Sequence, residues 1–353
     1  MPERDLHKQP FDESTRTKLL IYRSYIRAWL QVFLHAERFR GKPLQFFDFF
    51  CGPGEDSAGE PGSPLIVVNE LFAERARIDQ RGHSVRLFFN DHDAGKIENL
   101  RRLCSEKSLA WQPQFESLDF ADAFKKVENE IGKYPSLVFI DQNGLKHVTR
   151  KVFDGLTAVA ATDFLFFTAS SFKQRFGDLV APEIKLPAST LRLDVHRVLA
   201  DVYRQWAPKG IFIGHFSLKK SANVYGLVFG SHHWRGMLKF LEIVWKLDAN
   251  CGEADYEMES STVQGEMYFE DGKTGFKKRK IEVFQDQLSK LITNRTFMTD
   301  KAVFLYCLTN GFLPRVAKDV YANLRDSNIL QNSRHTLPRY SADAMKEPRK
   351  LQL

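Results

Sequence analysis

The chain has 353 residues and a formal net charge of +7, with 43% hydrophobic and 27% charged residues. This length is enough for two or three globular domains, and the composition excludes a mostly disordered chain. No apolar run reaches the roughly 20 residues of a membrane helix, and the N-terminal residues lack the apolar core of a secretion signal. We therefore expect a cytoplasmic protein that does not bind a membrane.

Strand and helix patterns alternate through the first two thirds of the chain. Apolar residues at steps of three and four predict a helix over 18–39 that packs on the sheet formed by the later strands. Strands are expected at 44–50, 85–90, 114–118, 136–140 and 163–168, with helices at 64–77, 94–105, 121–131 and 150–160 between them. Two close apolar runs at 211–217 and 224–229 predict a hairpin at the sheet edge, flanked by helices at 190–205 and 234–247. The fold class is thus α/β, a Rossmann-like doubly wound and mostly parallel sheet with an antiparallel edge hairpin.

The remainder of the chain has a different pattern. We expect an N-terminal helical segment at 1–43, the Rossmann domain at 44–248, a flexible insert at 249–280 and a last domain at 281–353. Helices at 281–292, 300–309 and 314–325, a short strand at 328–331 and a basic tail predict that the last domain is winged-helix-like. Its third helix would turn Arg315 and Lys318 outward, toward nucleic acid or toward a partner protein, and the sequence favours neither.

A glycine-rich turn follows the first strand, in the sequence FFDFFCGPGEDSAGEPGSP at 46–64. Asp48 ends the strand, and at Gly52 and Gly54 the backbone can approach a ligand closely. The four cysteines, at positions 51, 104, 251 and 307, have no zinc spacing and are expected to be free thiols. No metal site is predicted.

Three more aspartates, Asp91, Asp119 and Asp141, follow later strands of the predicted sheet. The carboxyl ends of parallel strands meet at one edge, where ligands of doubly wound sheets bind. A positively charged nucleoside cofactor would place its amino group at Asp48, its ribose at Asp91 and its adenine at Asp119, with Asp141 where the transferred group meets its acceptor. Alternatively, Asp91 and Asp119 cap the helices that follow them.

The run D-x-F-x-G-P-G, which includes Phe50, and the G-S-P after it resemble the three-Cys-motif partner proteins. So do FIDQNGLK and YGLVFGSHHWRGMLKFLEIVWKLD further along the chain. This bacterial group has the fold of Rossmann-like methyltransferases. The resemblance implies S-adenosylmethionine as cofactor and a partner that carries three cysteines and is similar to radical S-adenosylmethionine enzymes. With the basic tail, it favours methyl transfer to nucleic acid or a nucleotide-related substrate.

The segment after the fourth strand departs from the family, since Gln142 replaces a proline and no aromatic residue follows. Methyltransferases of base amines tend to have Asp/Asn-Pro-Pro-aromatic here, so amine methylation is disfavoured. Asp141 and Asn143 remain the candidate catalytic residues. Substrate contacts are expected from Lys146, Lys173 and Arg175. The competing hypothesis is a methyltransferase-fold subunit without catalysis that binds nucleic acid or a partner enzyme.

Overall fold

The computed structural model describes residues 9–107, 111–141, 146–169, 184, 195–220, 223–247, 255–256, 267–270, 273–276, 280–333 and 335–353. The chain divides into two compact units, Met1–Lys239 and Phe240–Leu353. The predicted insert at 249–280 lies largely outside the described residues.

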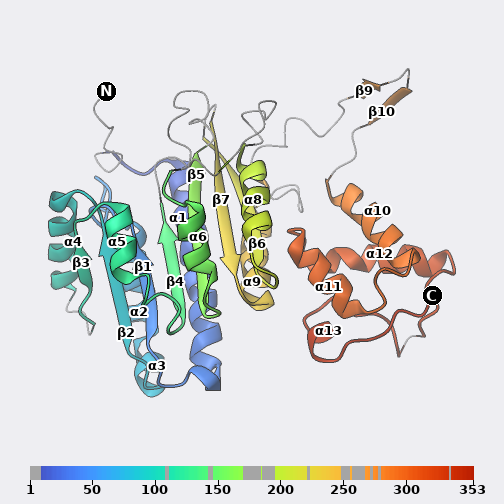
Figure 1. Ribbon diagram of the computed structural model, residues 1–353, viewed down its shortest axis with the longest axis horizontal. Helices are drawn as coiled ribbons and strands as arrows, with labels where there is room; N and C mark the ends of the chain where they lie inside the picture. Colours follow the sequence, from blue (N-terminus) through green and yellow to red (C-terminus); the bar gives the residue numbers. More distant parts are fainter. Residues whose placement is uncertain are drawn as a thin grey trace. The chain divides into compact units, whose positions relative to one another are not determined.

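One sheet organises the first unit, with seven of its strands in the order β3-β2-β1-β4-β5-β7-β6 (Figure 1). β1 to β5 are parallel, and β7 is antiparallel to both of its neighbours. The strands are β1 (Leu44–Asp48), β2 (Val85–Asn90), β3 (Gln114–Glu116), β4 (Ser136–Ile140), β5 (Thr162–Ala169), β6 (Phe212–Lys220) and β7 (Asn223–Ser231). The predicted Rossmann-like, mostly parallel sheet with an added hairpin is confirmed.

The direction of winding reverses between β1 and β4. β2 and β3 extend the sheet to one side of β1, and the chain then returns to add β4 on the other side. In doubly wound sheets ligands bind outside the carboxyl ends of the strands at this reversal. Asp48 at the end of β1 pairs in register with Phe139 of β4, so the turn after β1 and the segment after β4 start side by side.

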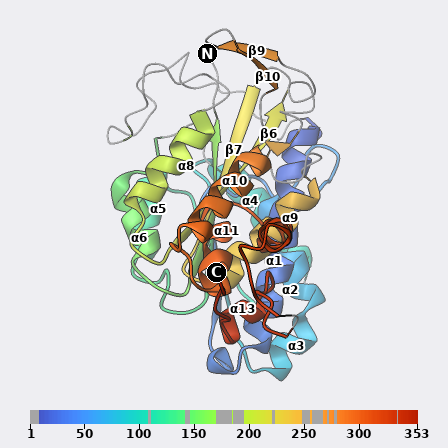
Figure 2. The same ribbon diagram turned by 90° about the vertical axis from the view of Figure 1, so that its right-hand side faces the viewer.

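Helices cover both faces of the sheet (Figure 2). The helices of this unit are α1 (Glu13–His35), η2 (Glu37–Phe39), α2 (Ser63–Ala73), α3 (Arg75–Gln80), α4 (Ala94–Glu106), α5 (Phe120–Val127), α6 (Arg150–Thr157), α8 (Val195–Trp206) and α9 (Trp234–Leu247), the last of which continues into the second unit. α1 packs on one face, where Tyr22 stacks on Phe139 with ring centroids 4.1 Å apart and Trp29 contacts Phe46.

On the other face, aromatic side chains of the strands pack against α5, α6 and α8. Phe49 contacts Phe124 of α5, and Phe166 contacts Tyr203 of α8. All five residues of β1 and all five of β4 are buried. Strands covered on both faces read as continuous apolar runs rather than alternating ones. This explains why phenylalanine is so frequent in the strand sequences.

The second unit contains a helical cluster. Its elements are β8 (Asp255–Tyr256), β9 (Met267–Glu270), β10 (Lys273–Phe276), α10 (Lys280–Thr293), α11 (Asp300–Thr309), η5 (Pro314–Val316), α12 (Ala317–Asp326) and α13 (Asp343–Lys346). β9 and β10 form an antiparallel pair. The buried carboxylate of Asp300 accepts hydrogen bonds from the backbone N–H groups of Arg339 and Arg349, at 2.9 and 2.8 Å. The basic tail is therefore fastened to the start of α11.

The strand predicted at 328–331 is wrong. Asn328 has a positive φ of 56°, and the N–H groups of Ile329 and Leu330 bond back to the carbonyl of Leu324 at the end of α12. The N–H of Gln331 bonds to the carbonyl of Gln352 in the tail. Helix-end bonds and a contact distant in sequence thus use the backbone groups that a strand would need. The winged-helix character of this unit stays a prediction.

Candidate functional site

The turn after β1 is built on two glycines with positive φ, 63° at Gly52 and 100° at Gly54. Such angles favour glycine because a Cβ would strain the backbone. At Gly54 a Cβ would also lie 2.9 Å from Leu100 Cδ1 and 3.1 Å from Leu103 Cδ1. The turn is therefore packed tightly against α4.

Asp91 joins this turn to the end of β2. Its Oδ2 accepts the backbone N–H of Gly52 at 3.1 Å, and its Oδ1 accepts that of Asp93 at 3.0 Å. Asp93, not Asp91, caps α4, because its Oδ1 accepts the N–H groups of Gly95 and Lys96. Asp91 thus lies at the predicted cofactor edge, where each of its oxygens accepts one backbone bond and Oδ1 also lies 3.4 Å from His92 Nδ1.

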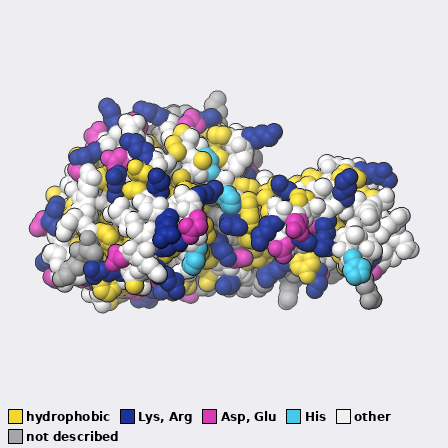
Figure 3. Space-filling model, turned by 90° about the horizontal axis from the view of Figure 1, so that it is seen from below, with side chains coloured by type: hydrophobic (Ala, Val, Ile, Leu, Met, Phe, Trp, Pro, Cys, Tyr) yellow, Lys and Arg dark blue, Asp and Glu magenta, His cyan; other side chains and the backbone are white. Residues whose placement is uncertain are grey.

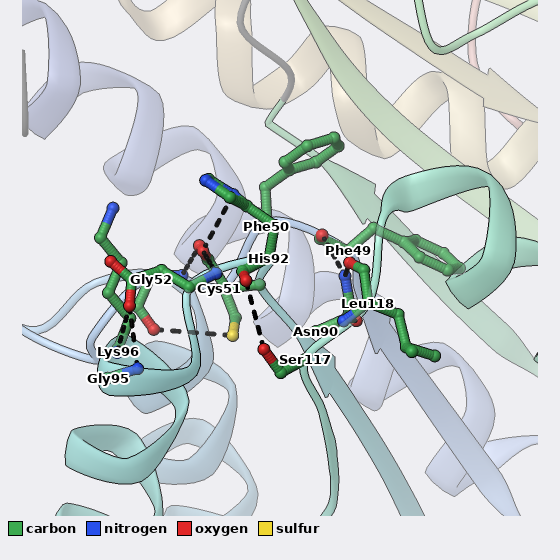
Figure 4. A network of polar contacts seen from close by, with 12 residues as sticks. Phe49, Phe50, Cys51, Gly52, Asn90, His92, Gly95, Lys96, Ser117 and Leu118 are labelled. Atoms are coloured by element: carbon green, nitrogen blue, oxygen red, sulfur yellow. Dashed lines mark hydrogen bonds and ion pairs between the residues drawn. The ribbon is translucent and has the colours of Figure 1, made fainter. Parts of the chain in front are cut away.

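Asn90 joins the ends of three strands (Figure 4). Its side-chain amide donates to the carbonyls of Phe49 and Leu118 at 3.2 and 3.0 Å, and its Oδ1 accepts the N–H of Leu118 at 3.1 Å. The side chain is buried, so losing it would leave several backbone groups without partners. Sequence reasoning missed Asn90, although a polar residue that ends the apolar run VRLFF was a usable signal.

Asp48 is a buried acid beneath the turn, with 1% of its surface exposed. Its Oδ1 accepts the N–H of Phe50 at 3.2 Å, and its Oδ2 has no hydrogen-bond partner among the described residues. Burial raises the pKa of Asp48 to about 7; the Ser63 hydroxyl and the Phe50 N–H lower it, whereas the charges of Asp141 and Asp91 raise it. The Ser63 hydroxyl thus lowers the pKa of Asp48 as a nearby dipole, without a hydrogen bond to Oδ2.

An aromatic cluster lies beside the turn. Phe50 stacks on Phe120 at 5.5 Å between centroids with an interplanar angle of 10°, and the ring of His147 is 5.1 Å from both. Burial and the neighbouring charge of Lys146 lower the pKa of His147 to about 4, against the opposing effect of Asp119. His147 is therefore a neutral imidazole at pH 7 and is packed rather than fully solvated.

Asp119 precedes α5 at its N-cap position, but its side chain makes no capping hydrogen bond. The residue is exposed, and its charge acts on His147, so its carboxylate lies near the aromatic cluster. The structure thus gives no support to the capping interpretation of Asp119.

Asp141 begins the segment after β4 and forms an ion pair with Lys18 of α1. The Lys18 ammonium also lies over the ring of Phe167, 4.9 Å from its centroid. Both side chains are largely buried, with 15% of Lys18 and 31% of Asp141 exposed. Sequence reasoning missed Lys18, and because 123 residues separate the pair, no local pattern could have revealed it.

The segment before α1 is also attached to the turn region. Asp56 accepts three backbone hydrogen bonds, from Phe11 at 2.6 Å, Glu60 at 2.8 Å and Ala58 at 2.9 Å. Burial alone would raise the pKa of Asp56, but these three N–H groups bring it below its usual value. Arg16 adds an exposed ion pair with Glu60 at 2.7 Å. The start of α1 therefore covers the same edge of the sheet as the turn.

Of the remaining predicted contacts, Lys146 is the one that the structure describes in the first unit. Lys146 is exposed beside His147, whereas Asn143, Lys173 and Arg175 lie outside the described residues. Arg315 and Lys318 belong to the second unit, where both are exposed and Arg315 lies over the ring of Trp245. Within the described residues, no group of three His, Cys, Asp or Glu side chains is placed to hold a metal ion. None of the described helices has the length and apolar character of a membrane span.

Comparison with known proteins gives faint structural similarities, two of which are described below. No protein-family model and no curated protein matches the sequence. The crystal structure of DszA carbon methyltransferase is similar with a TM-score of 0.35 and 11% identity, covering 57% of this chain and 50% of that one. The structure "StiE O-MT residues 942-1257" is similar with a TM-score of 0.28 and 9% identity, covering 56% of this chain and 71% of that one. The match spans half the length of the first structure, and at such TM-scores neither supports a conclusion about this chain.

Proposed function

We propose that this chain is a methyltransferase that uses S-adenosylmethionine. The observation that carries the proposal is Asp48, a buried acid with a pKa of about 7 and an oxygen without a hydrogen-bond partner among the described residues. It lies under a glycine turn, where a doubly wound sheet binds ligands. A cation beside Asp48 would favour its ionised form, and a nucleoside cofactor with an amino group supplies one.

The residues around the turn fit such a cofactor. Gly52 and Gly54 bring the backbone of the turn close to the site, and Asp48 would face the amino group. A carboxylate has about four acceptor positions, so Asp91 can accept ribose hydroxyls besides the N–H groups of Gly52 and Asp93. Asp119 would bind the adenine amino group, with the face of Phe50 against the base. Because Asp48 is almost fully buried, its contact with the amino group requires the covering side chains to shift.

Once bound, the cofactor supplies a methyl group on a positively charged sulfur. An electrophile of this kind needs mainly alignment and exclusion of water, which a general base can assist. His147 is neutral at pH 7, but its lowered pKa of about 4 makes it a weak base there, so the reaction we propose depends on alignment and exclusion of water rather than on proton transfer to His147. Asp141, held by Lys18 after β4, would orient the acceptor, together with Asn143.

The substrate class we propose is nucleic acid or a nucleotide-related molecule, and the partner is the three-cysteine protein that the sequence resemblance implies. Arg315 and Lys318 of the second unit are exposed, as phosphate contacts must be. Asp319 is next to Lys318 on α12 and is also exposed, so this surface of α12 carries both positive and negative charge. Lys146, Lys173 and Arg175 are the proposed contacts near the transferred methyl group.

Labelled cofactor tests the activity directly. The pure chain, alone and with its partner, is incubated with S-[methyl-³H]adenosylmethionine and total nucleic acid. We expect incorporation in the wild type and a loss of at least tenfold in Asp119→Asn, whereas Asp122→Asn on the exposed side of α5 retains it. Incorporation that is absent in every mixture would contradict the proposed activity.

The second candidate function is a non-catalytic subunit that binds nucleic acid or a partner enzyme. The ion pair between Lys18 and Asp141 supports it, because the proposed acceptor contact is already engaged by α1. Binding of the cofactor without any methyl transfer, together with binding of nucleic acid or the partner, would favour this candidate over the first.

A further inference from the structure

A cavity lies at the opposite edge of the sheet from the glycine turn. Its volume is about 480 Å³, within the range of small-molecule sites. Asp163 at the start of β5 and Ser231 at the end of the antiparallel β7 belong to its lining, and the two pair in register. Because β5 runs parallel to β1, the start of β5 and the end of β1 lie at opposite edges. This cavity is therefore separate from the proposed methyl-donor site.

Aromatic side chains form much of its wall. Trp29 and Phe33 of α1 lie 4.4 Å apart between centroids, and Phe33 contacts Phe39 at 5.0 Å. Tyr25 of α1 and Trp234, the first residue of α9, also belong to the aromatic lining. Such a wall suits a flat ring.

Two exposed arginines, Arg38 and Arg235, belong to the lining of the cavity and form its rim. Arg38 lies over the ring of Phe39 at 4.6 Å, and Arg235 lies over the ring of Trp234 at 5.2 Å. Both are exposed, and neither forms an ion pair with any described residue. Glu37 on the same rim is engaged instead with Arg81 at 2.6 Å and Arg40 at 3.9 Å.

The guanidinium groups of Arg38 and Arg235 both affect the same side chain, that of His233. Their charges, after burial, lower the pKa of His233, with Arg235 having the larger effect of the two. His233 Nδ1 accepts the N–H of Arg235 at 3.1 Å, which fixes the ring at the start of α9. The positive end of the α9 helix dipole also lies there. Figure 3 views the molecule from this edge of the sheet and shows Lys and Arg side chains beside hydrophobic and His side chains.

The inner wall has the opposite character. Asp163 accepts the hydroxyl of Tyr25 at 2.7 Å; burial raises its pKa to about 6, while the Ser231 and Tyr25 hydroxyls lower it. A carboxyl inside and guanidinium groups on the rim would orient a ligand that has an aromatic body and an acidic end.

We propose that this cavity binds a planar aromatic carboxylate, with its ring against the Trp29 and Trp234 side chains and its carboxylate at Arg38 and Arg235. The site is distinct from that of the proposed cofactor and requires no methyl transfer.

Calorimetry of the full chain with naphthalene-2-carboxylate tests the proposal. We expect one site per chain and binding at least tenfold weaker for the neutral 2-naphthamide, because a charge-assisted bond to the rim is lost. Saturating S-adenosylmethionine should not displace the carboxylate. Tighter binding of 2-naphthylmethylammonium would instead assign the site to cations through Asp163 and overturn the proposal.

Variants locate the binding. Arg38→Gln and Arg235→Gln should each weaken it at least tenfold, and Ala28→Phe should block the cavity from α1. Arg86→Gln is the matched control, because Arg86 also stacks on an aromatic ring, that of Tyr134, without lining this cavity. If Ala28→Phe does not fold, the two arginine variants alone test whether the carboxylate binds in this cavity. No binding by the wild type, or equal binding in both arginine variants and the wild type, overturns the proposal.

Discussion

The backbone N–H of Gly52 donates to Asp91 Oδ2 over 3.1 Å and joins the glycine turn after β1 to the end of β2. A second bond, from the Asp93 N–H to Oδ1, holds the carboxylate in place. The acid that we propose for the ribose thus also shapes the turn beside it. Removing Asp91 should therefore affect both stability and cofactor binding.

Replacing Asp91 with alanine should lower the free energy of unfolding by about 1–3 kcal/mol, since the buried N–H of Gly52 and the partly buried N–H of Asp93 lose their acceptor. Urea denaturation measures the change. Asp93→Ala, which removes the exposed α4 cap, should cost about 1 kcal/mol and leave cofactor affinity unchanged. Equal effects of the two substitutions on affinity would contradict the role of Asp91 at the turn.

Gly54→Ala should be much more harmful than Gly59→Ala. Both glycines have positive φ, 100° and 78°, so both substitutions strain the backbone by roughly 1–2 kcal/mol. Only at Gly54 would the new Cβ overlap neighbouring atoms, at 2.9 Å from Leu100; nothing lies within 4 Å at Gly59. Thermal unfolding should show Gly54→Ala at least ~1 kcal/mol less stable than Gly59→Ala, an overpacking cost. Similar losses of stability in the two variants would show that a Cβ at Gly54 can be accommodated without overlap.

The ion pair between Lys18 and Asp141 should couple the two residues measurably. A double-mutant cycle with Lys18→Met and Asp141→Asn should give a coupling energy of about 1–3 kcal/mol, since the pair is largely buried and removing one partner strands the other. The exposed pair of Arg16 and Glu60, also between α1 and the turn region, is the control and should give at most about 1 kcal/mol. Equal coupling energies in both cycles would contradict a stronger attachment of α1 to the segment after β4 through Lys18 and Asp141.

Asp48 should make stability fall as pH rises from about 4 to about 7. Its folded pKa of about 7 lies above the unfolded value of about 3.9, so the folded state binds the extra proton in that window. The contribution is full below the unfolded pKa and is lost as pH rises through the folded pKa. Asp48→Asn lacks this titration, so its stability should not fall in that window. The free energy of unfolding of the variant minus that of the wild type should therefore rise by on the order of 2–4 kcal/mol between pH 5 and pH 8. The exposed Asp122→Asn should not, and parallel pH curves for wild type and Asp48→Asn would contradict the raised pKa.

Much of the fold was predictable because its signals are local. Helix and strand periods predicted the alternation from 44 to 169, and the bounds 85–90 and 136–140 agree with β2 and β4. The glycines and strand-end acids were also found, since their residue types carry the signal. The strand expected at 328–331 failed because the backbone groups there bond to Leu324 and to Gln352, and the second partner is distant in sequence.

The site was predictable only in part. Sequence order placed Asp48, Asp91, Asp119 and Asp141 at one edge, but not their partners. The ion pair between Lys18 and Asp141 and the contact between the rings of His147 and Phe50 depend on tertiary packing, which the sequence pattern does not encode locally.

Calorimetric titration of the pure chain with S-adenosylmethionine at pH 6 to 7 tests the central claim most directly. We predict one site per chain, affinity that rises with pH through about 7 as Asp48 ionises, and at least tenfold weaker binding by Asp48→Asn. Asp163→Asn, at a second acid whose pKa is raised, should bind as the wild type does. No binding by the wild type, or equal binding by both variants, would contradict a methyl-donor site at the turn after β1.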